Sequence, residues 1–233
     1  MDEEKGKSLA ALLLEVFTSP GKAFKEIAER PRFLAAGITL TIINLAFSLL
    51  TLPKVQEYSL IMLEKMKEML PPDQVETLTQ SMSAQTVATT TVVGAIILPW
   101  FFWLVMAVIL KIFAAVTDKD APFRKMFAVS VYGYVPTIIS GIITSIILCF
   151  TAAENIEKVS LSLAVFSPSE SGFLYYFLKS CNPFTWWSLI LWGIGAAAVM
   201  KAKRPNGVLI YLFSLWLVYA LLIGAVGLLN IPT

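Results

Sequence analysis

The feature that most constrains this chain is a set of five segments that contain no Asp, Glu, Lys or Arg. They are residues 33–53, 77–110, 126–153, 180–200 and 205–233. Each reaches or exceeds the ~20 residues that an α-helix needs to cross the hydrocarbon layer of a bilayer. An ionised side chain at mid-bilayer costs about 3 kcal/mol, and all 18 basic and 16 acidic residues avoid these segments. We therefore predict an all-α, polytopic membrane protein that is a five-transmembrane-helix bundle.

Composition and pattern exclude the main alternatives. Hydrophobic residues make up 57% of the chain, which is more apolar surface than one globular core can bury. Charged residues make up 15%, against ~25% in an ordinary soluble domain. The apolar segments do not alternate with polar residues as the strands of a membrane β-barrel do.

Flanking residues place the boundaries of the helices. We expect spans at about 33–53, 87–113, 126–150, 184–200 and 207–229, within a membrane domain at 33–230. Residues 1–32 form a separate cytoplasmic segment in this reading. This segment shows no signal-peptide pattern, because Glu15 interrupts a short apolar run, so the first span is expected to direct insertion.

Basic residues indicate the orientation, because short cytoplasmic loops are enriched in Lys and Arg. The two shortest loops, "VTDKDAPFRK" and "KAKRPNG", are both basic and fall on the same side of the membrane as residue 1. Lys54, Lys65, Lys67, Lys158 and Lys179 are the five basic residues left on the other side. We predict a cytoplasmic N-terminus and an extracytoplasmic C-terminus.

Two segments outside the spans have helical patterns. In "TSPGKAFKEIAERPRF", the residues Phe24, Ile27 and Ala28 share one face, which predicts a short amphipathic helix lying on the inner membrane surface. It would set the entry angle of the first span or, alternatively, dock a partner. Residues 54–86 repeat apolar residues at helical spacing, which predicts a helical hairpin in the first outer loop.

A stripe of small and polar residues follows one face of the first span. Its members are Gly37, Thr41, Asn44, Ser48 and Thr51, at spacings of 4, 3, 4 and 3. Such a face permits close approach and hydrogen bonding between transmembrane helices. We expect it to face a neighbouring helix, with Asn44, near mid-bilayer, as the one polar residue that could do more than pack.

A second stripe follows the third span, which begins after Arg124 and Lys125. Its members are Ser130, Gly133, Thr137, Ser140 or Gly141, and Thr144. The candidate packing or partner-binding residues here are Gly133, Thr137 and Gly141 of this stripe, together with Tyr134 and Pro136. The proline removes a backbone donor and frees a carbonyl near residue 132, which then needs a partner from a neighbouring helix or a hydroxyl. We expect a kinked helix at the centre of the bundle, beside the second span with its own Pro99.

Two cysteines flank the second outer loop. Cys149 ends the third span and Cys181 precedes the fourth. Both fall on the outer side in the predicted topology, so a disulfide that pins this loop and a pair of free thiols both remain open.

The sequence also resembles a known family. "FRKMFAVSVYGYVP" is similar to the central signature of the Yip family of Ypt/Rab-interacting membrane proteins, and "NPFTWWSLILWGIGAAAVMKAK" resembles its penultimate span. "VFTSPGKAFKEIAERPRF" resembles the segment before the first span in short prokaryotic members. The resemblance implies vesicle traffic and Rab GTPases for eukaryotic members. The short segment before the first span argues against a Rab-type partner and suggests a prokaryotic protein of the plasma (inner) membrane.

The sequence lacks the residues that acid–base catalysis, ion coupling within the membrane and nucleotide binding usually require. The chain has no histidine, no acidic residue inside a span and no glycine-rich phosphate loop. We therefore expect no catalytic residues, no cofactor, no metal and no nucleic-acid partner.

Three functions remain. The first is a non-enzymatic scaffold or adaptor of the Yip type, which contacts membrane lipids and organises another membrane protein or further copies of itself. The second is a transport component with a polar path between spans one to three, lined by Asn44, Pro99 and Pro136. The third is a lipid-handling enzyme, for which the outer-loop glutamates would be the acidic groups. We favour the first.

Overall fold

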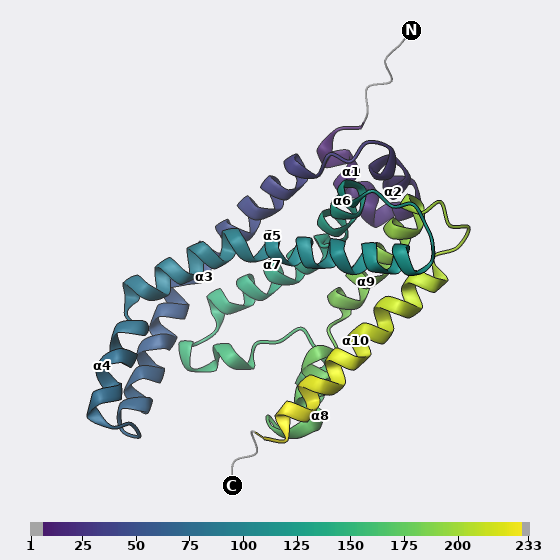
Figure 1. Ribbon diagram of the computed structural model, residues 1–233. Helices are drawn as coiled ribbons and strands as arrows, with labels where there is room; N and C mark the ends of the chain where they lie inside the picture. The colour runs from purple at the N-terminus through teal and green to yellow at the C-terminus, as the bar shows by residue number, and fades with distance from the viewer. Residues whose placement is uncertain (1–6, 230–233) are drawn as a thin grey trace.

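The computed structural model describes residues 7–229, apart from the side chains of residues 72 and 73. Helices joined by turns and loops make up this part of the chain, which contains no strand (Figure 1). The helices in chain order are α1 (Leu9–Thr18), α2 (Pro20–Glu29), α3 (Phe33–Lys67), α4 (Pro72–Ser81), α5 (Ala84–Val116), α6 (Phe123–Gly133), α7 (Val135–Phe150), η1 (Ala153–Lys158), η2 (Leu163–Phe166), α8 (Gly172–Ser180), α9 (Pro183–Val199) and α10 (Asn206–Gly227). The all-α, multi-pass class predicted from the sequence is confirmed.

Four helical segments of the described chain are long and apolar enough to cross a membrane. They are α3, α5, the continuous segment 123–150 that contains α6 and α7, and α10. The predicted fourth span corresponds to α9, which is apolar but only 17 residues long. At ~1.5 Å per residue it measures about 25 Å, slightly less than the ~30 Å hydrocarbon layer.

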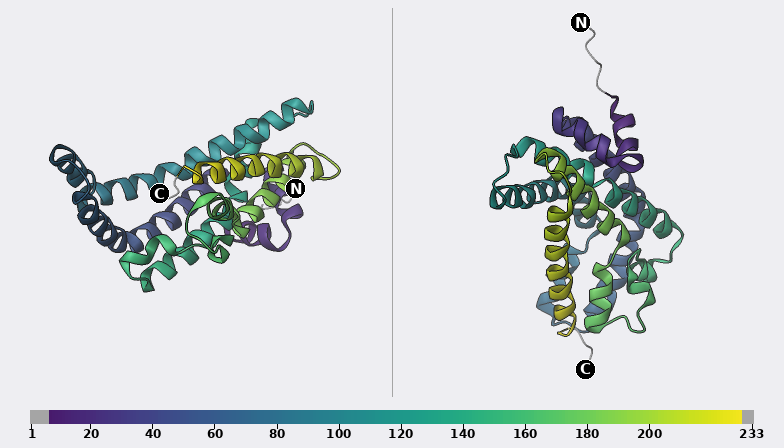
Figure 2. Two further views of the ribbon diagram at one scale, coloured as in Figure 1. Left: turned by 90° about the horizontal axis from the view of Figure 1, so that it is seen from below. Right: turned by 90° about the vertical axis from the view of Figure 1, so that its right-hand side faces the viewer.

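The short helix α9 lies at the centre of the bundle. It packs against α2, α6, α7 and α10, and most of its residues from Ser188 to Val199 are buried. On the other side of the molecule α3 runs along both α5 and α7 (Figures 1 and 2). Buried Trp103, Tyr132 and Leu191 belong to the core that joins the two groups of helices.

The first predicted span and the first half of the outer hairpin form one continuous helix. Pro53 lies inside α3, which continues to Lys67 and is about 52 Å long. A proline removes one backbone donor but does not end a helix when the apolar helical pattern continues on both sides. Gln56 Nε2 donates to the Ala84 carbonyl oxygen (2.8 Å), so α3 and α5 stay paired as far as the first residue of α5. The result is a projecting hairpin of α3, α4 and α5, seen at one side in Figures 1 and 2.

The predicted position of the amphipathic helix is wrong. Phe24 and Ile27 of α2 are fully buried inside the protein, and Ala28 is nearly so. An added Cβ at Gly195 of α9 would lie 2.7 Å from the Phe24 ring, so the ring sits directly on that glycine. The apolar face of α2 is therefore covered by α9 and α6 and does not lie on the membrane surface.

The third span is interrupted at one residue, Tyr134, whose backbone angles stay in the helical region (φ −80°, ψ −9°). Helix α6 ends at Gly133, Tyr134 takes a turn conformation, and α7 begins at Val135 with Pro136 in its first turn. Proline is favoured there because the first-turn N–H groups have no partner within the helix. Pro136 thus starts a helix here.

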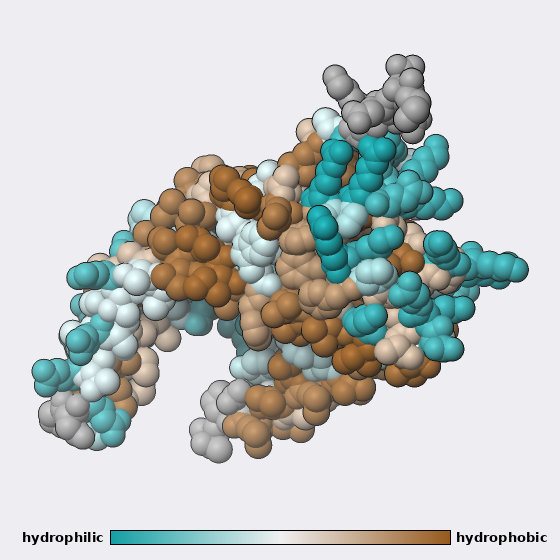
Figure 3. Space-filling model, turned by 45° about the horizontal axis from the view of Figure 1, so that its top comes forward, coloured by the Kyte–Doolittle hydropathy of each residue, from teal (hydrophilic) through white to brown (hydrophobic). Residues whose placement is uncertain are grey.

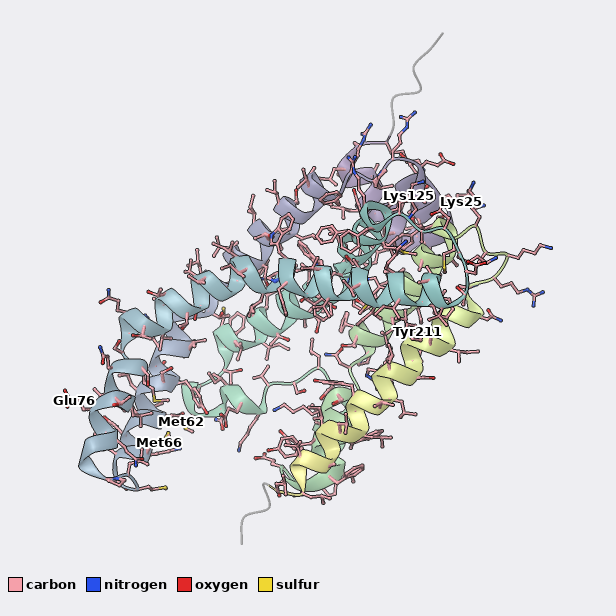
Figure 4. All side chains as sticks on the ribbon, viewed as in Figure 1. Lys25, Met62, Met66, Glu76, Lys125 and Tyr211 are labelled. Carbon is pink, nitrogen blue, oxygen red and sulfur yellow. The ribbon has the colours of Figure 1, made fainter. Side chains whose placement is uncertain are left out.

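Hydrophilic residues gather at the ends of the molecule and apolar residues between them (Figure 3). The middle of the surface exposes large apolar side chains, including Phe101, Ile210 and Leu222 at 62%, 69% and 62%. Exposed charges are carried by α2, by the loop after α5 and by the loop after α9. Lys25 and Lys125 lie at this same end (Figure 4). This distribution matches a protein that faces lipid around its middle.

Candidate functional site

Asn44 of the first predicted stripe bonds to a backbone group that Pro99 leaves free. Its Nδ2 donates to the Ala95 carbonyl oxygen at 2.9 Å. In an unbroken helix that carbonyl would accept from the N–H of residue 99, which a proline lacks. In lipid such a carbonyl needs another donor, and the Asn44 amide supplies it. Asn44 and Pro99, predicted separately as site residues, therefore form one unit between α3 and α5.

Gly37 and Thr41 pack against two tryptophans of α5. A Cβ on Gly37 would lie 2.9 Å from the Trp100 ring, so the ring rests on the glycine backbone. Trp100 Nε1 donates to Thr41 Oγ1 (2.9 Å), which itself donates to the Gly37 carbonyl (2.8 Å). The Trp100 and Trp103 rings meet edge to face at 5.2 Å. Through these contacts, this part of the stripe packs against α5.

Ser48 and Gly141 meet in a small cavity between α3 and α7. The cavity has a volume of about 40 Å³, and Asn44 and Ser145 supply further polar lining. Since one water needs about 10–15 Å³ by this kind of measure, the cavity has room for a few water molecules. Apolar side chains, among them Ile138, form the rest of its wall.

The break after α6 is filled by Trp192 of α9. Tyr134 N–H turns back to the Val131 carbonyl (3.2 Å), and Trp192 Nε1 donates to the Ser130 carbonyl (3.0 Å). A Cβ on Gly133 would lie 2.2 Å from the Trp192 ring, closer than real side chains ever approach. Glycine is therefore needed at 133 for the indole to reach this carbonyl. The Ser130 carbonyl is free because the Tyr134 N–H bonds to Val131 instead; this carbonyl is distinct from the one near residue 132 that the sequence singled out.

The remaining candidates of the third span lie around the same junction. Thr137 Oγ1 and the buried Ser188 Oγ are hydrogen-bonded at 3.1 Å between α7 and α9. The Tyr134 ring contacts Phe102 and Trp103 of α5, with centroids 5.1 and 5.9 Å apart. We name the junction of α3, α5, α6, α7 and α9 the packing junction. All ten packing candidates named from the sequence lie in it or on its edge.

The packing junction holds few groups that could perform chemistry. Within residues 7–229, the buried side-chain nitrogen or oxygen atoms without a hydrogen-bond partner are the indole nitrogens of Trp103 and Trp186. The described residues contain no cluster of His, Cys, Asp or Glu that could hold a metal. The hydroxyl, amide and indole groups of the packing junction donate and accept hydrogen bonds between helices.

Both cysteines are free thiols in the structure. Cys181, between α8 and α9, is buried and its thiol donates to the Phe177 carbonyl (3.4 Å). Burial raises the pKa of the Cys181 thiol. Cys149, near the end of α7, is half-buried.

Sequence reasoning missed the partners of the stripes. It singled out the small residues of α3 and α7 but not Trp100 or Trp192, which fill the spaces that those residues leave. The available signal was the pairing of Trp192 with Gly193 and Gly195 in one short apolar segment. Bulky and small residues in adjacent turns are typical of helices that interlock closely.

Comparison with known proteins gives one match. The family model described as the Yip1 domain matches residues 14–226, nearly the whole chain. No curated protein and no solved structure matches.

Proposed function

The chain belongs to the Yip1 domain family, and from this premise we propose that it is a non-enzymatic membrane scaffold that organises or stabilises a membrane protein complex. Its partner in this proposal is another membrane protein or a second copy of the chain. The family and the apolar helices together make it a multi-pass membrane protein. The scaffold role and the prokaryotic plasma membrane are our inferences.

The observation that carries the proposal is that polar side chains within the bundle form hydrogen bonds between its helices. Asn44, Trp100 and Trp192 all bond to atoms of neighbouring helices. A transport path would need such groups free to contact a solute. Here Asn44 and Trp192 donate to backbone carbonyls beside Pro99 and beside the α6–α7 break, and Trp100 donates to the Thr41 hydroxyl. Helices joined in this way form a stiff body, which suits a protein that positions others.

The projecting hairpin of α3, α4 and α5 offers a surface for a partner. It extends beyond the bilayer because α3 is about 20 Å longer than the hydrocarbon layer is thick. Met62 and Met66 lie along its α3 arm (Figure 4), and Met69 at its tip is 82% exposed. Flexible methionine side chains adapt to varied apolar surfaces.

We further infer the orientation and the fifth crossing. The described chain begins, at α1, at the end that carries the two short basic loops, and α10 ends at the opposite end beside α8 (Figure 1). The positive-inside rule assigns the basic end to the cytoplasm. With α9 as the fifth crossing, residues 1–32 are cytoplasmic and the projecting hairpin is extracytoplasmic.

Site-specific photo-crosslinking in native membranes tests the scaffold. A photoreactive amino acid at Met69 should give discrete protein adducts, while the same group at the lipid-facing Ile210 of α10, 69% exposed, should give mainly lipid adducts. The absence of discrete adducts from Met69 and from a set of further hairpin positions would reject a docking role for the hairpin.

A flux assay separates the transport alternative. Liposomes that contain the purified protein should leak ions and small solutes at the rate of empty liposomes. Flux that exceeds this background and disappears in Asn44→Leu would favour the transport component instead.

A further inference from the structure

A lateral groove between α5, α9 and α10 adjoins the packing junction and shares Phe102, Tyr134, Thr137 and Trp192 with it. Its volume is about 520 Å³, within the ~300–1,000 Å³ typical of ligand sites. Helix α10 packs mainly on α8 and α9 and touches α5 at its first half only. There the Tyr211 hydroxyl donates to the Ile109 carbonyl (3.5 Å), and the Phe113 and Tyr211 rings meet at 5.1 Å. Figure 4 labels Tyr211 at this closed end, from which α5 and α10 diverge.

The lining of the groove is mainly apolar. Met106, Leu189 and Leu212 belong to this apolar part, and Tyr134 and Thr137 also line the groove. Its open end, beside α8, is made by Lys179, Asn182, Thr185 and Tyr219. The polar end and the apolar floor are separated by about two helical turns, or about 10 Å, since Tyr219 and Leu212 are seven residues apart on α10.

The polar end is not saturated by the protein. None of the ion pairs among residues 7–229 involves Lys179, whose ammonium group lies 5.8 Å from the centre of the Tyr175 ring. The hydroxyls of Thr185 and Tyr219 make no hydrogen bond within the described chain, and Tyr219 is 56% exposed. One cation and two hydroxyls therefore meet where an apolar groove opens.

We propose that this groove binds one anionic glycerophospholipid. An acyl chain fills the floor between α5, α9 and α10, and the phosphate lies beside Lys179 at the level of α8. The ammonium charge matches the phosphate, and the mainly apolar lining with its polar open end matches a molecule that is polar at one end and apolar at the other. The groove opens between two lipid-facing helices, so such a lipid enters directly from the bilayer. The inference goes beyond the scaffold proposal and does not depend on it.

Native mass spectrometry of the full chain tests the site with two probes, phosphatidylglycerol and phosphatidylcholine of the same acyl chains. The wild type should retain about fivefold more phosphatidylglycerol, the factor that one nearby lysine gives toward an anionic headgroup. Lys179→Ala should remove this preference. Lys158→Ala is the matched control, because Lys158 is a surface lysine outside the groove that pairs with Glu170 (3.9 Å). It should behave as the wild type.

A second variant tests the apolar floor. Leu215 lines the groove and is 41% exposed, so Leu215→Trp should fill the space without disturbing the core and should lower retention of both lipids. The proposal is overturned if Lys179→Ala keeps the wild-type preference, if the wild type retains both lipids equally, or if Leu215→Trp retains phosphatidylglycerol unchanged. A peptide found in the groove in place of lipid would also overturn it.

Discussion

Asn44 and Trp192 each complete a backbone that a proline or a turn has interrupted. Asn44 donates to the carbonyl four residues before Pro99, and Trp192 donates to a carbonyl at the break that precedes Pro136. Inside a membrane no water is available for this task, and each unbonded backbone group costs several kcal/mol. The two side chains therefore allow α5 and the α6–α7 segment to be irregular within the bilayer.

Asn44→Leu should lower the free energy of unfolding by about 1–3 kcal/mol, since the Ala95 carbonyl loses its donor in an apolar environment. Adding Pro99→Ala returns a backbone N–H to that carbonyl. The double variant should therefore recover most of the loss, measured by SDS titration in mixed micelles. Strictly additive effects of the two substitutions would contradict the pairing.

Gly133→Ala should destabilise the protein by about 1–3 kcal/mol, because the new methyl group collides with the buried Trp192 ring. Gly141→Ala is the matched control in the same segment, since a Cβ there meets no atom within 4 Å. It should leave stability unchanged or raise it by up to about 1 kcal/mol through helix propensity. Equal effects of both substitutions in thermal unfolding would refute the close contact at Gly133.

The two thiols should be free in the purified protein, so reduction should leave its intact mass unchanged. In a Cys149→Ala variant, alkylation of Cys181 should be slow at neutral pH. Burial raises its pKa, and the thiolate is the reactive form, so the rate should continue to rise beyond the pH at which an exposed thiol reaches its plateau. A mass increase of about 2 Da on reduction would indicate a disulfide between the two cysteines instead.

Among the elements, α2 and α9 depend on each other. Helix α9 has glycine and alanine where α2 and α6 approach, and the Phe24 ring occupies the space above Gly195. The contact ties residues before the first span to the core of the bundle. The same contact covers α9 with protein at the end next to the basic loop 200–205. This matters because α9, at 17 residues, is slightly shorter than the hydrocarbon layer.

Phe24→Ala should cost about 3–5 kcal/mol, as for a fully buried aromatic residue, and should expose the backbone of α2. Hydrogen exchange of residues 20–29 should speed up in this variant. Lys25→Ala, at an exposed position of the same helix, should change stability by less than about 0.5 kcal/mol. If residues 20–29 exchange at the wild-type rate in Phe24→Ala, the packing of α2 on α9 is contradicted, and α2 would instead lie on the membrane surface.

Individual elements differ in how well the sequence predicts them. The absence of charge predicts the long helices, because the cost of burying an ion in lipid acts on every residue of a span. The apolar face of α2 predicts a helix but not what covers it, because apolar side chains are stabilised both by contact with lipid and by contact with protein. The stripe around Asn44 predicts a packed face, but not that the partner of Asn44 is the carbonyl left by Pro99. That pairing depends on how α3 and α5 align along each other.

For the whole molecule, we infer that the five charge-free segments cross a membrane and place the two short basic loops together on one side. The polar groups inside the bundle and the apolar belt around it both follow from that arrangement. By length, α9 has the smallest margin for spanning the hydrocarbon layer, because it has only 17 residues and is shorter than the other four segments.

Accessibility labelling on either side of α9 is the most direct measurement. Single cysteines replace Gln80, Lys119, Lys179 and Lys203 in turn, in a chain whose own two cysteines are changed to alanine. With a membrane-impermeant maleimide on intact cells, positions 80 and 179 should react, and positions 119 and 203 should react only after permeabilisation. Labelling of positions 179 and 203 from the same side would mean that α9 does not cross, and would contradict the account.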